Sequence, residues 1–163
     1  MSMYVLQVKP GTDLHVAVQL RKKGHLVRCP QRTMDIRKDG AWNSRTEPIF
    51  PGYLFVEEEI DRKRYDNICQ TDGVVGFLRS SGGAIGKLKP HEEAYIQWLW
   101  NYGKPITASR IYTTFHGDKM VLSGVLRNYW NQVVKLDLRQ RRARVRVPIC
   151  GHEYTITLPV IGI

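Results

Sequence analysis

The sequence predicts an α+β protein whose amino-terminal part is an antiparallel sheet flanked by helices and whose carboxy-terminal part is a small all-β barrel. In residues 1–100, short β-prone runs alternate with stretches of helical apolar spacing in the order βαββαβα, which favours helices packed on a mainly antiparallel sheet. From Gly117 onward only short strands with closely spaced turns follow, a pattern typical of a small barrel. Residues 101–109 contain a proline, a glycine and small polar residues without an apolar period, as linkers do. We therefore expect domains at 1–101 and 113–163, joined by a linker at 102–112.

Turn residues and caps delimit the elements of the first part. Pro10-Gly11 ends the first strand, Thr12 or Asp13 can cap the first helix, and Gly24 stops it. Pro30 implies an edge or a bulge in the second strand, and the turn signal at 37–40 precedes a polar loop to Thr46. We predict strands at 3–8, 26–36, 52–56 and 74–78, and helices at 13–23, 61–69 and 90–100. The first helix is expected to bury Leu14, Ala17, Val18 and Leu20.

The barrel elements follow from short β-prone runs with turns between them. We predict strands at 119–122, 132–138, 144–149 and 154–158.

Charge points to a polyanionic partner. The chain has 25 lysines and arginines against 15 aspartates and glutamates, a formal charge of +10. Residues 1–100 hold 15 basic and 12 acidic side chains (+3), whereas residues 113–163 hold 8 and 3 (+5) in half the length. The surplus is therefore concentrated in the predicted barrel.

Several classes of protein are not expected. No apolar run approaches the roughly 20 residues that span a bilayer, and the first residues contain no cationic leader. Cys29, Cys69 and Cys150 are far apart and form no C-x-x-C pair, which favours a reducing cytoplasm and argues against structural zinc. The five histidines have no metal-ligand spacing, and Glu57-Glu58-Glu59 is interpreted as a solvated charge run. We expect no catalysis, no metal and no cofactor.

The most specific feature is the segment Glu47-Pro48-Ile49-Phe50-Pro51-Gly52-Tyr53-Leu54-Phe55-Val56. Two prolines and a glycine fix the start of a strand that carries aromatic residues. Tyr53 and Phe55 share one face of a pleated strand. The pattern leaves two alternatives open, namely core packing and an apolar patch for a partner protein.

Two basic features are candidate nucleic-acid contacts. His15, Gln19, Lys22 and Lys23 share one stripe of the first helix. Arg142, Arg144 and Arg146 share one face of a strand whose Val145 and Val147 point inward, and Arg139 and Arg141 crowd the preceding turn. In both places, a solvated surface remains the alternative.

The motifs resemble the NusG family of transcription elongation factors. Phe50-Pro51-Gly52-Tyr53-Leu54-Phe55-Val56, preceded by Tyr4-Val5-Leu6-Gln7-Val8 and followed by Gly73-Val74-Val75-Gly76-Phe77-Leu78, is similar to its NGN domain. The segments 117–131 and 133–137 are similar to its KOW barrel. The basic barrel and the short linker look more like specialised paralogs such as LoaP or RfaH.

The resemblance implies a processive antitermination factor. It implies docking on the clamp helices of RNA polymerase by the positions that match the family's aromatic surface: Tyr4, Phe50, Pro51, Tyr53 and Phe55. It implies contact with nontemplate DNA at Lys9 and the helix stripe, with an RNA hairpin at the barrel arginines, or with both, and the two placements remain alternatives. Tyr129 and Trp130 match the loop through which family barrels contact a partner such as a ribosomal protein. We expect one of these two side chains to lie in the core and the other to contact the partner. The alternative is a ribosome-associated or general RNA-binding KOW protein; in either case we expect a monomer without membrane contact.

Overall fold

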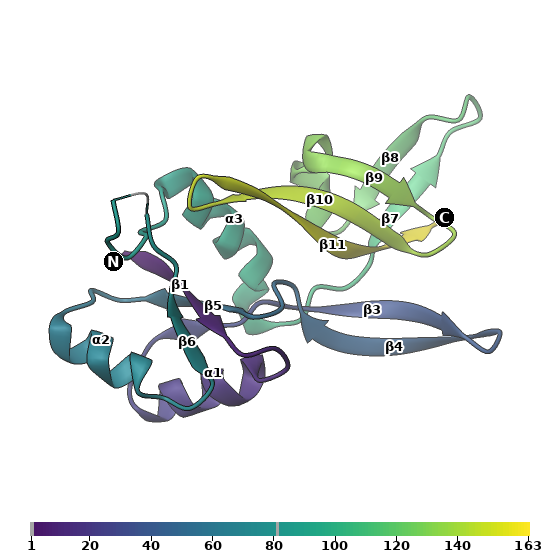
Figure 1. The fold of residues 1–163 in the computed structure, drawn as a ribbon. Helices are drawn as coiled ribbons and strands as arrows, with labels where there is room; N and C mark the ends of the chain where they lie inside the picture. Colours follow the sequence, from purple (N-terminus) through teal and green to yellow (C-terminus); the bar gives the residue numbers. More distant parts are fainter. Residues whose placement is uncertain (1, 81) are drawn as a thin grey trace. The chain divides into compact units, whose positions relative to one another are not determined.

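A computed structural model describes residues 2–80 and 82–163 (Figure 1). The helices and strands occur in this order: β1 (Met3–Val8), α1 (Asp13–Lys22), β2 (Val27–Arg28), β3 (Gln31–Lys38), β4 (Ala41–Pro48), β5 (Tyr53–Glu57), α2 (Arg62–Cys69), β6 (Val74–Phe77), α3 (Pro90–Trp100), β7 (Ser109–Thr113), β8 (Lys119–Ser123), β9 (Val133–Asp137), β10 (Arg142–Ile149) and β11 (His152–Gly162). Three 3₁₀ turns, η1 (Asn101–Gly103), η2 (Val125–Asn128) and η3 (Trp130–Gln132), complete the described elements.

The chain forms two compact units. The first comprises Met1–Cys29, Phe50–Ala94 and Ile149–Gly151, and the second comprises Pro30–Ile49, Tyr95–Pro148 and His152–Ile163.

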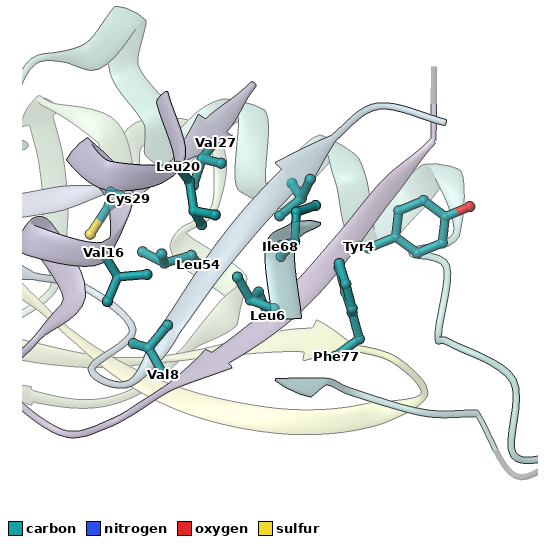
Figure 2. Close-up of a cluster of buried hydrophobic side chains, with 12 residues drawn as sticks. Tyr4, Leu6, Val8, Val16, Leu20, Val27, Cys29, Leu54, Ile68 and Phe77 are labelled. Atoms are coloured by element: carbon teal, nitrogen blue, oxygen red, sulfur yellow. The ribbon is translucent and has the colours of Figure 1, made fainter. Parts of the chain in front are cut away.

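The first unit is built on an antiparallel sheet with the order β2-β5-β1-β6. Residues of β1 and β5 that point to one face pack against Val16 and Leu20 of α1 and Ile68 of α2, so both helices cover this face (Figure 2). The predicted antiparallel sheet flanked by helices is therefore confirmed. Burial of this apolar face supplies the main stabilisation of the unit.

The second unit contains a five-stranded half-barrel with the order β8-β7-β11-β10-β9. The pairs β7–β8 and β9–β10 are antiparallel, whereas β11 and β7 run parallel. Fully buried Ile111, Leu126, Val145, Leu158 and Val160 form its interior. The predicted all-β second part is thus confirmed, with β8 and β9 at the two ends of the hydrogen-bonding order.

The β3–β4 hairpin is the main departure from the expected elements. The predicted strand at 26–36 is divided into β2 and β3 at Pro30, and the polar loop expected up to Thr46 is the strand β4, paired with β3 from Gln31↔Pro48 to Lys38↔Ala41. Asp39 and Gly40 both have positive φ (52° and 78°), as the two-residue turn of a hairpin requires. The strand escaped prediction because most of its residues are polar and exposed, so no apolar alternation marks it.

The hairpin is joined to the half-barrel within the second unit. Arg32 donates a hydrogen bond to the backbone oxygen of Thr157 in β11 and forms an ion pair with Glu47 across the hairpin. The amide of Thr33 donates to the oxygen of Ile106 at 2.8 Å. The strand β7 was also not expected, because it overlaps the predicted linker and only one of its two buried residues, Ile111, is apolar.

Candidate binding surfaces

The aromatic motif begins at a turn that is fixed by three hydrogen bonds. Gly52 has a φ of 86°, a conformation that glycine adopts without a steric penalty. Its amide donates to the carboxylate of Asp13 at 2.6 Å, and its oxygen accepts from the amide of Val8 at 2.9 Å. The amide of Tyr53 donates to the oxygen of Phe50 at 3.0 Å. The start of β5 is thereby tied to both α1 and β1.

The strand register separates the expected aromatic residues onto two faces. Val5 lies opposite Phe55 and Gln7 opposite Tyr53, so Tyr53 and Phe55 share a face, as predicted. Tyr4 lies opposite Val56 and belongs to the helix-covered core, where its ring meets Phe77 edge-on. Tyr4 therefore points to the opposite side of the sheet from Tyr53.

Burial further divides this set. Phe55 is fully buried, and its ring meets the buried ring of Phe50 edge-on at 5.1 Å between centroids. Tyr53 is half-buried and Pro51 is exposed. Tyr53 and Pro51 are thus the accessible part of the motif, while Phe50 and Phe55 support them from inside.

The predicted stripe of α1 is largely on the surface. Lys9, His15 and Lys22 are exposed and Gln19 is half-buried. Lys23 is exposed, but its ammonium donates to the hydroxyl of Thr71 at 2.7 Å and to the oxygen of Asn67 at 3.2 Å, which joins the end of α1 to α2.

The buried side of α1 differs from the expected one. Leu14 and Val18 were expected to be buried but are 44% and 43% exposed, and the buried side chains are Asp13, Val16, Ala17 and Leu20. Asp13 lies on the buried side because its carboxylate accepts from Gly52, which rotates the apolar stripe away from Leu14. The basic stripe of α1 is consequently bordered by two exposed apolar side chains.

A buried polar cluster was missed by the sequence analysis. Glu58 was expected in a solvated run but is buried, and its carboxylate lies 2.7 Å from Nδ1 of buried His25. Nε2 of the same histidine lies 2.7 Å from Oδ1 of Asn67. The signal was present in the sequence, because Glu58 continues the alternation of Leu54 and Val56 and therefore faces the helices.

The arginine strand β10 has the predicted alternation. Ala143, Val145 and Val147 are fully buried, whereas Arg144 and Arg146 are exposed. Arg144 lies opposite exposed Lys135 of β9, which extends the positive charge across two strands.

The other two arginines of this face each lie close to an acidic residue. Arg142 is half-buried and lies opposite Asp137 of β9. Arg146 has a carboxylate of Glu153 at 3.5 Å, in a pair whose two side chains are about half exposed or more.

The two arginines of the preceding turn differ from each other. Arg141 forms an ion pair with Asp35 of β3 at 3.1 Å, and its guanidinium lies over the ring of Trp42 at 3.9 Å from the centroid. Arg139 is exposed and, with Arg37 of the hairpin, lines a polar cavity of about 500 Å³. Arg141 is therefore engaged within the protein, whereas Arg139 lines an open polar cavity.

The loop aromatics also occupy different environments. The ring of Tyr129 packs against Trp98 at 4.1 Å and Tyr95 at 5.2 Å between centroids. Trp130 begins η3 and is half-buried. Tyr129 thus belongs to an aromatic cluster with the end of α3.

The described residues contain three buried or partly buried cysteines and no cluster of side chains suited to a metal ion. No group of three or more histidine, cysteine, aspartate or glutamate side chains able to hold a metal occurs among residues 2–80 and 82–163. Burial raises the pKa of the Cys29 thiol to about 12, with a smaller contribution from the charge of Asp13, and raises the pKa of Cys69 and Cys150 in the same direction. Of the helices in the described part, none has the length and apolar character needed to cross a membrane.

Comparisons with known proteins match nearly the whole chain. The family model described as transcription termination factor nusG matches residues 1–97. The transcription termination/antitermination protein NusG of a Synechocystis species is 22% identical over 95% of this chain and 84% of its own length, and that of Treponema pallidum is 27% identical over 84% and 78%. A solved structure described as domain interaction in Thermotoga maritima NusG has the same fold, with a TM-score of 0.61 and 22% identity over 98% of this chain and 93% of the other.

Proposed function

Because the family model covers residues 1–97, which are more than half of the chain, the chain belongs to the NusG family, and from this premise we propose that it is a processive antitermination factor that docks on RNA polymerase and contacts nucleic acid. The relatives are named as transcription termination/antitermination proteins. The chain is accordingly a transcription factor and not an enzyme.

The observation that carries the docking proposal is the supported aromatic turn. Tyr53 and Pro51 present accessible apolar surface at a strand start that is held by Asp13 and Val8. An aromatic side chain on a rigid base loses little conformational freedom on binding, which is why such residues are favoured at interface hot spots. We place polymerase docking at this turn, with Phe50 and Phe55 as internal supports and Tyr4 supporting the opposite face.

Nucleic-acid contact is supported by exposed cations on both units. On the second unit these are Arg139, Arg144, Arg146 and Lys135, and on the first unit Lys9 and Lys22; the helix stripe also exposes His15. Each phosphate that such cations neutralise releases counterions, which makes binding depend steeply on salt. We propose that the barrel cations hold RNA and the helix stripe contacts nontemplate DNA.

The finer assignments are also part of the proposal. We assign polymerase docking to residues 1–101 and RNA contact to residues 113–163, with 102–112 between them. The basic barrel favours a specialised role at particular transcripts, as in LoaP- or RfaH-like paralogs. A ribosomal protein that contacts Trp130 is the expected additional partner, and the protein is expected to act as a monomer.

The test of docking is polymerase capture with Tyr53→Ala. We expect this variant to bind purified RNA polymerase more weakly by about 1–3 kcal/mol, because it removes a hot-spot side chain. Tyr112→Ala, which truncates an exposed tyrosine of β7, is the matched control and should bind as the unmodified protein does. Equal capture of both variants, with unchanged circular dichroism, would overturn the docking assignment.

The test of activity is elongation by purified polymerase through a terminator. We expect the protein to increase read-through, and Tyr53→Ala to reduce that increase in proportion to its lost affinity. Read-through that is unchanged by the unmodified protein would contradict antitermination.

A further inference from the structure

The turn after α3 holds an unusual run of left-handed backbone. Asn101, Tyr102 and Gly103 have φ values of 49°, 56° and 82°. Residues with a Cβ rarely adopt this conformation, and such positions cluster at ligand sites where the surrounding structure holds them. The run directs Tyr102 outward, where its side chain is 95% exposed. An aromatic residue has thus been placed in solvent by an unfavourable turn.

This turn borders a cavity of about 600 Å³ whose aromatic lining is held in place. Trp98 lines it, donates from Nε1 to the oxygen of Val125 at 2.9 Å, and packs against the ring of Tyr129 at a tilt of 33°. Trp100 lines it as well, and a Cβ on Gly103 would lie 3.4 Å from its ring. Two indoles and the exposed Tyr102 ring therefore surround one opening, which lies wholly within the second unit.

The polar side chains of the cavity are primary amides. Gln97, Asn101 and Asn128 line it, and the lining contains no charged side chain. A primary amide offers both a donor and an acceptor, which matches the edge of a nucleobase. Asn128 is exposed, whereas the side-chain amide of Asn101 donates from Nδ2 to the oxygen of Lys104 at 3.4 Å. Exposed Arg127 directly precedes the lining residue Asn128, and exposed Lys104 follows the lining residue Tyr102 by two positions, so cations occur next to the lining segments in sequence.

Aromatic rings for stacking, amides for base edges and cations at the rim are the combination that binds unpaired nucleotides. A cavity without charge in its lining suits an uncharged planar base, while the phosphates of the same strand meet the rim cations. We infer that this cavity binds an unpaired nucleobase of single-stranded nucleic acid. The inference rests on the proposed nucleic-acid contact and locates part of it away from the arginine strand.

The experiment measures binding of the full chain to fluorescein-labelled oligonucleotides of about 12 nucleotides by anisotropy. Four probes are used: an RNA, a DNA of the same sequence, the RNA with abasic sites at its centre, and the RNA in a duplex. The variant is Tyr102→Ala, whose exposed side chain can be removed without opening the core. Phe115→Ala is the matched control, since it removes a ring that is 99% exposed between β7 and β8.

We expect Tyr102→Ala to weaken binding of the single-stranded RNA about 5- to 140-fold, the range for loss of one stacked base. It should leave binding of the abasic and duplex RNAs within about 2-fold, because there the base is missing or paired. Phe115→Ala should bind all probes as the unmodified protein does. Asn128→Leu should reduce discrimination between RNAs that differ in the unpaired base. If Tyr102→Ala weakens binding of the RNA more than binding of the DNA of the same sequence, RNA is the source of the base.

The contrary outcomes are distinct. If the unmodified protein binds the RNA with a salt dependence and Tyr102→Ala binds equally well, the cavity is not the base site, although the proposed nucleic-acid contact stands. Equal weakening of the abasic and intact RNA by Tyr102→Ala would likewise exclude base stacking. If Tyr102→Ala changes only polymerase capture, the cavity is a protein contact. No binding of any probe at low salt would refute both the inference and the nucleic-acid part of the proposed function.

Discussion

Replacing Arg141 with alanine should destabilise the protein, whereas replacing Arg144 should weaken its binding to nucleic acid. The Arg141–Asp35 pair has side chains 29% and 28% exposed, and a partly exposed ion pair contributes up to about 1 kcal/mol. The guanidinium over Trp42, at 3.9 Å from the ring centroid, adds about 0.5–1 kcal/mol. Arg141→Ala should therefore cost about 1–2 kcal/mol, which corresponds to a fall in melting temperature of roughly 2–8 °C for a chain of this size.

The assay combines thermal denaturation with a salt titration of RNA binding. Arg144 is exposed, so Arg144→Ala should stay within about 0.5 kcal/mol in stability. It should reduce the slope of log affinity against log salt by about 0.7 if it neutralises one phosphate of a single strand. Arg141→Ala should leave this slope unchanged.

A double-mutant cycle isolates the ring contact. Arg141→Ala, Trp42→Ala and the double variant should give a coupling free energy of about 0.5–1 kcal/mol. A coupling near zero would show that the contact is not formed in solution. A reduced salt slope in Arg141→Ala, with unchanged stability, would return Arg141 to the nucleic-acid surface and refute the reasoning.

Three further predictions concern the first unit. Gly52→Ala should lower the free energy of unfolding by about 1–2 kcal/mol in urea denaturation, because alanine is disfavoured at a φ of 86°; an unaltered midpoint would show that the turn relaxes. His25→Ala should lower the free energy of unfolding by about 1–3 kcal/mol, because it leaves the buried Glu58 carboxylate without its imidazole partner. Adding Glu58→Gln to this variant should recover part of the lost stability, a recovery that a purely steric role for His25 does not predict. Burial raises the pKa of Cys29 from 9.0 to about 12, so the unfolded chain loses the thiol proton at a lower pH than the folded chain does, and the free energy of unfolding should fall as pH rises from about 9 toward 12. Cys29→Ala should flatten this pH dependence. Identical pH profiles for the two proteins would exclude Cys29 as its source.

The sequence predicts those elements whose apolar residues follow a local period. The helices and the strands β1, β5 and β10 were found because burial on one face leaves a period of 3.6 or 2 in the chain. The strand β4 was missed because its hairpin is largely exposed and polar, although Asp39-Gly40 was recognised as a turn. The strand β7 was missed because it overlaps the segment assigned to the linker and its two buried positions are Ser109 and Ile111, so only one inward residue is apolar.

The candidate site shows the same division between local and distant information. The outward alternation of Arg144 and Arg146 is a local property of one strand and was predictable. The split between Tyr4 and Tyr53 depends on the register of β1 with β5, which neither strand encodes by itself. The pairing of Arg141 with Asp35 joins residues 106 apart, so local spacing alone assigned Arg141 to the binding surface.

The attachment of the β3–β4 hairpin to β11 has a consequence for the order in which the nascent protein acquires its structure. Arg32 and Thr157 are separated by 125 residues. At about 5–20 residues per second, the ribosome completes that interval in roughly 6–25 s, whereas a hairpin forms in microseconds. The contact of the hairpin with β11 therefore forms only near the end of synthesis, after its backbone bonds with Ile106 have become possible. By the same reasoning, a ribosome that stalls before Thr157 leaves Arg32 without this acceptor.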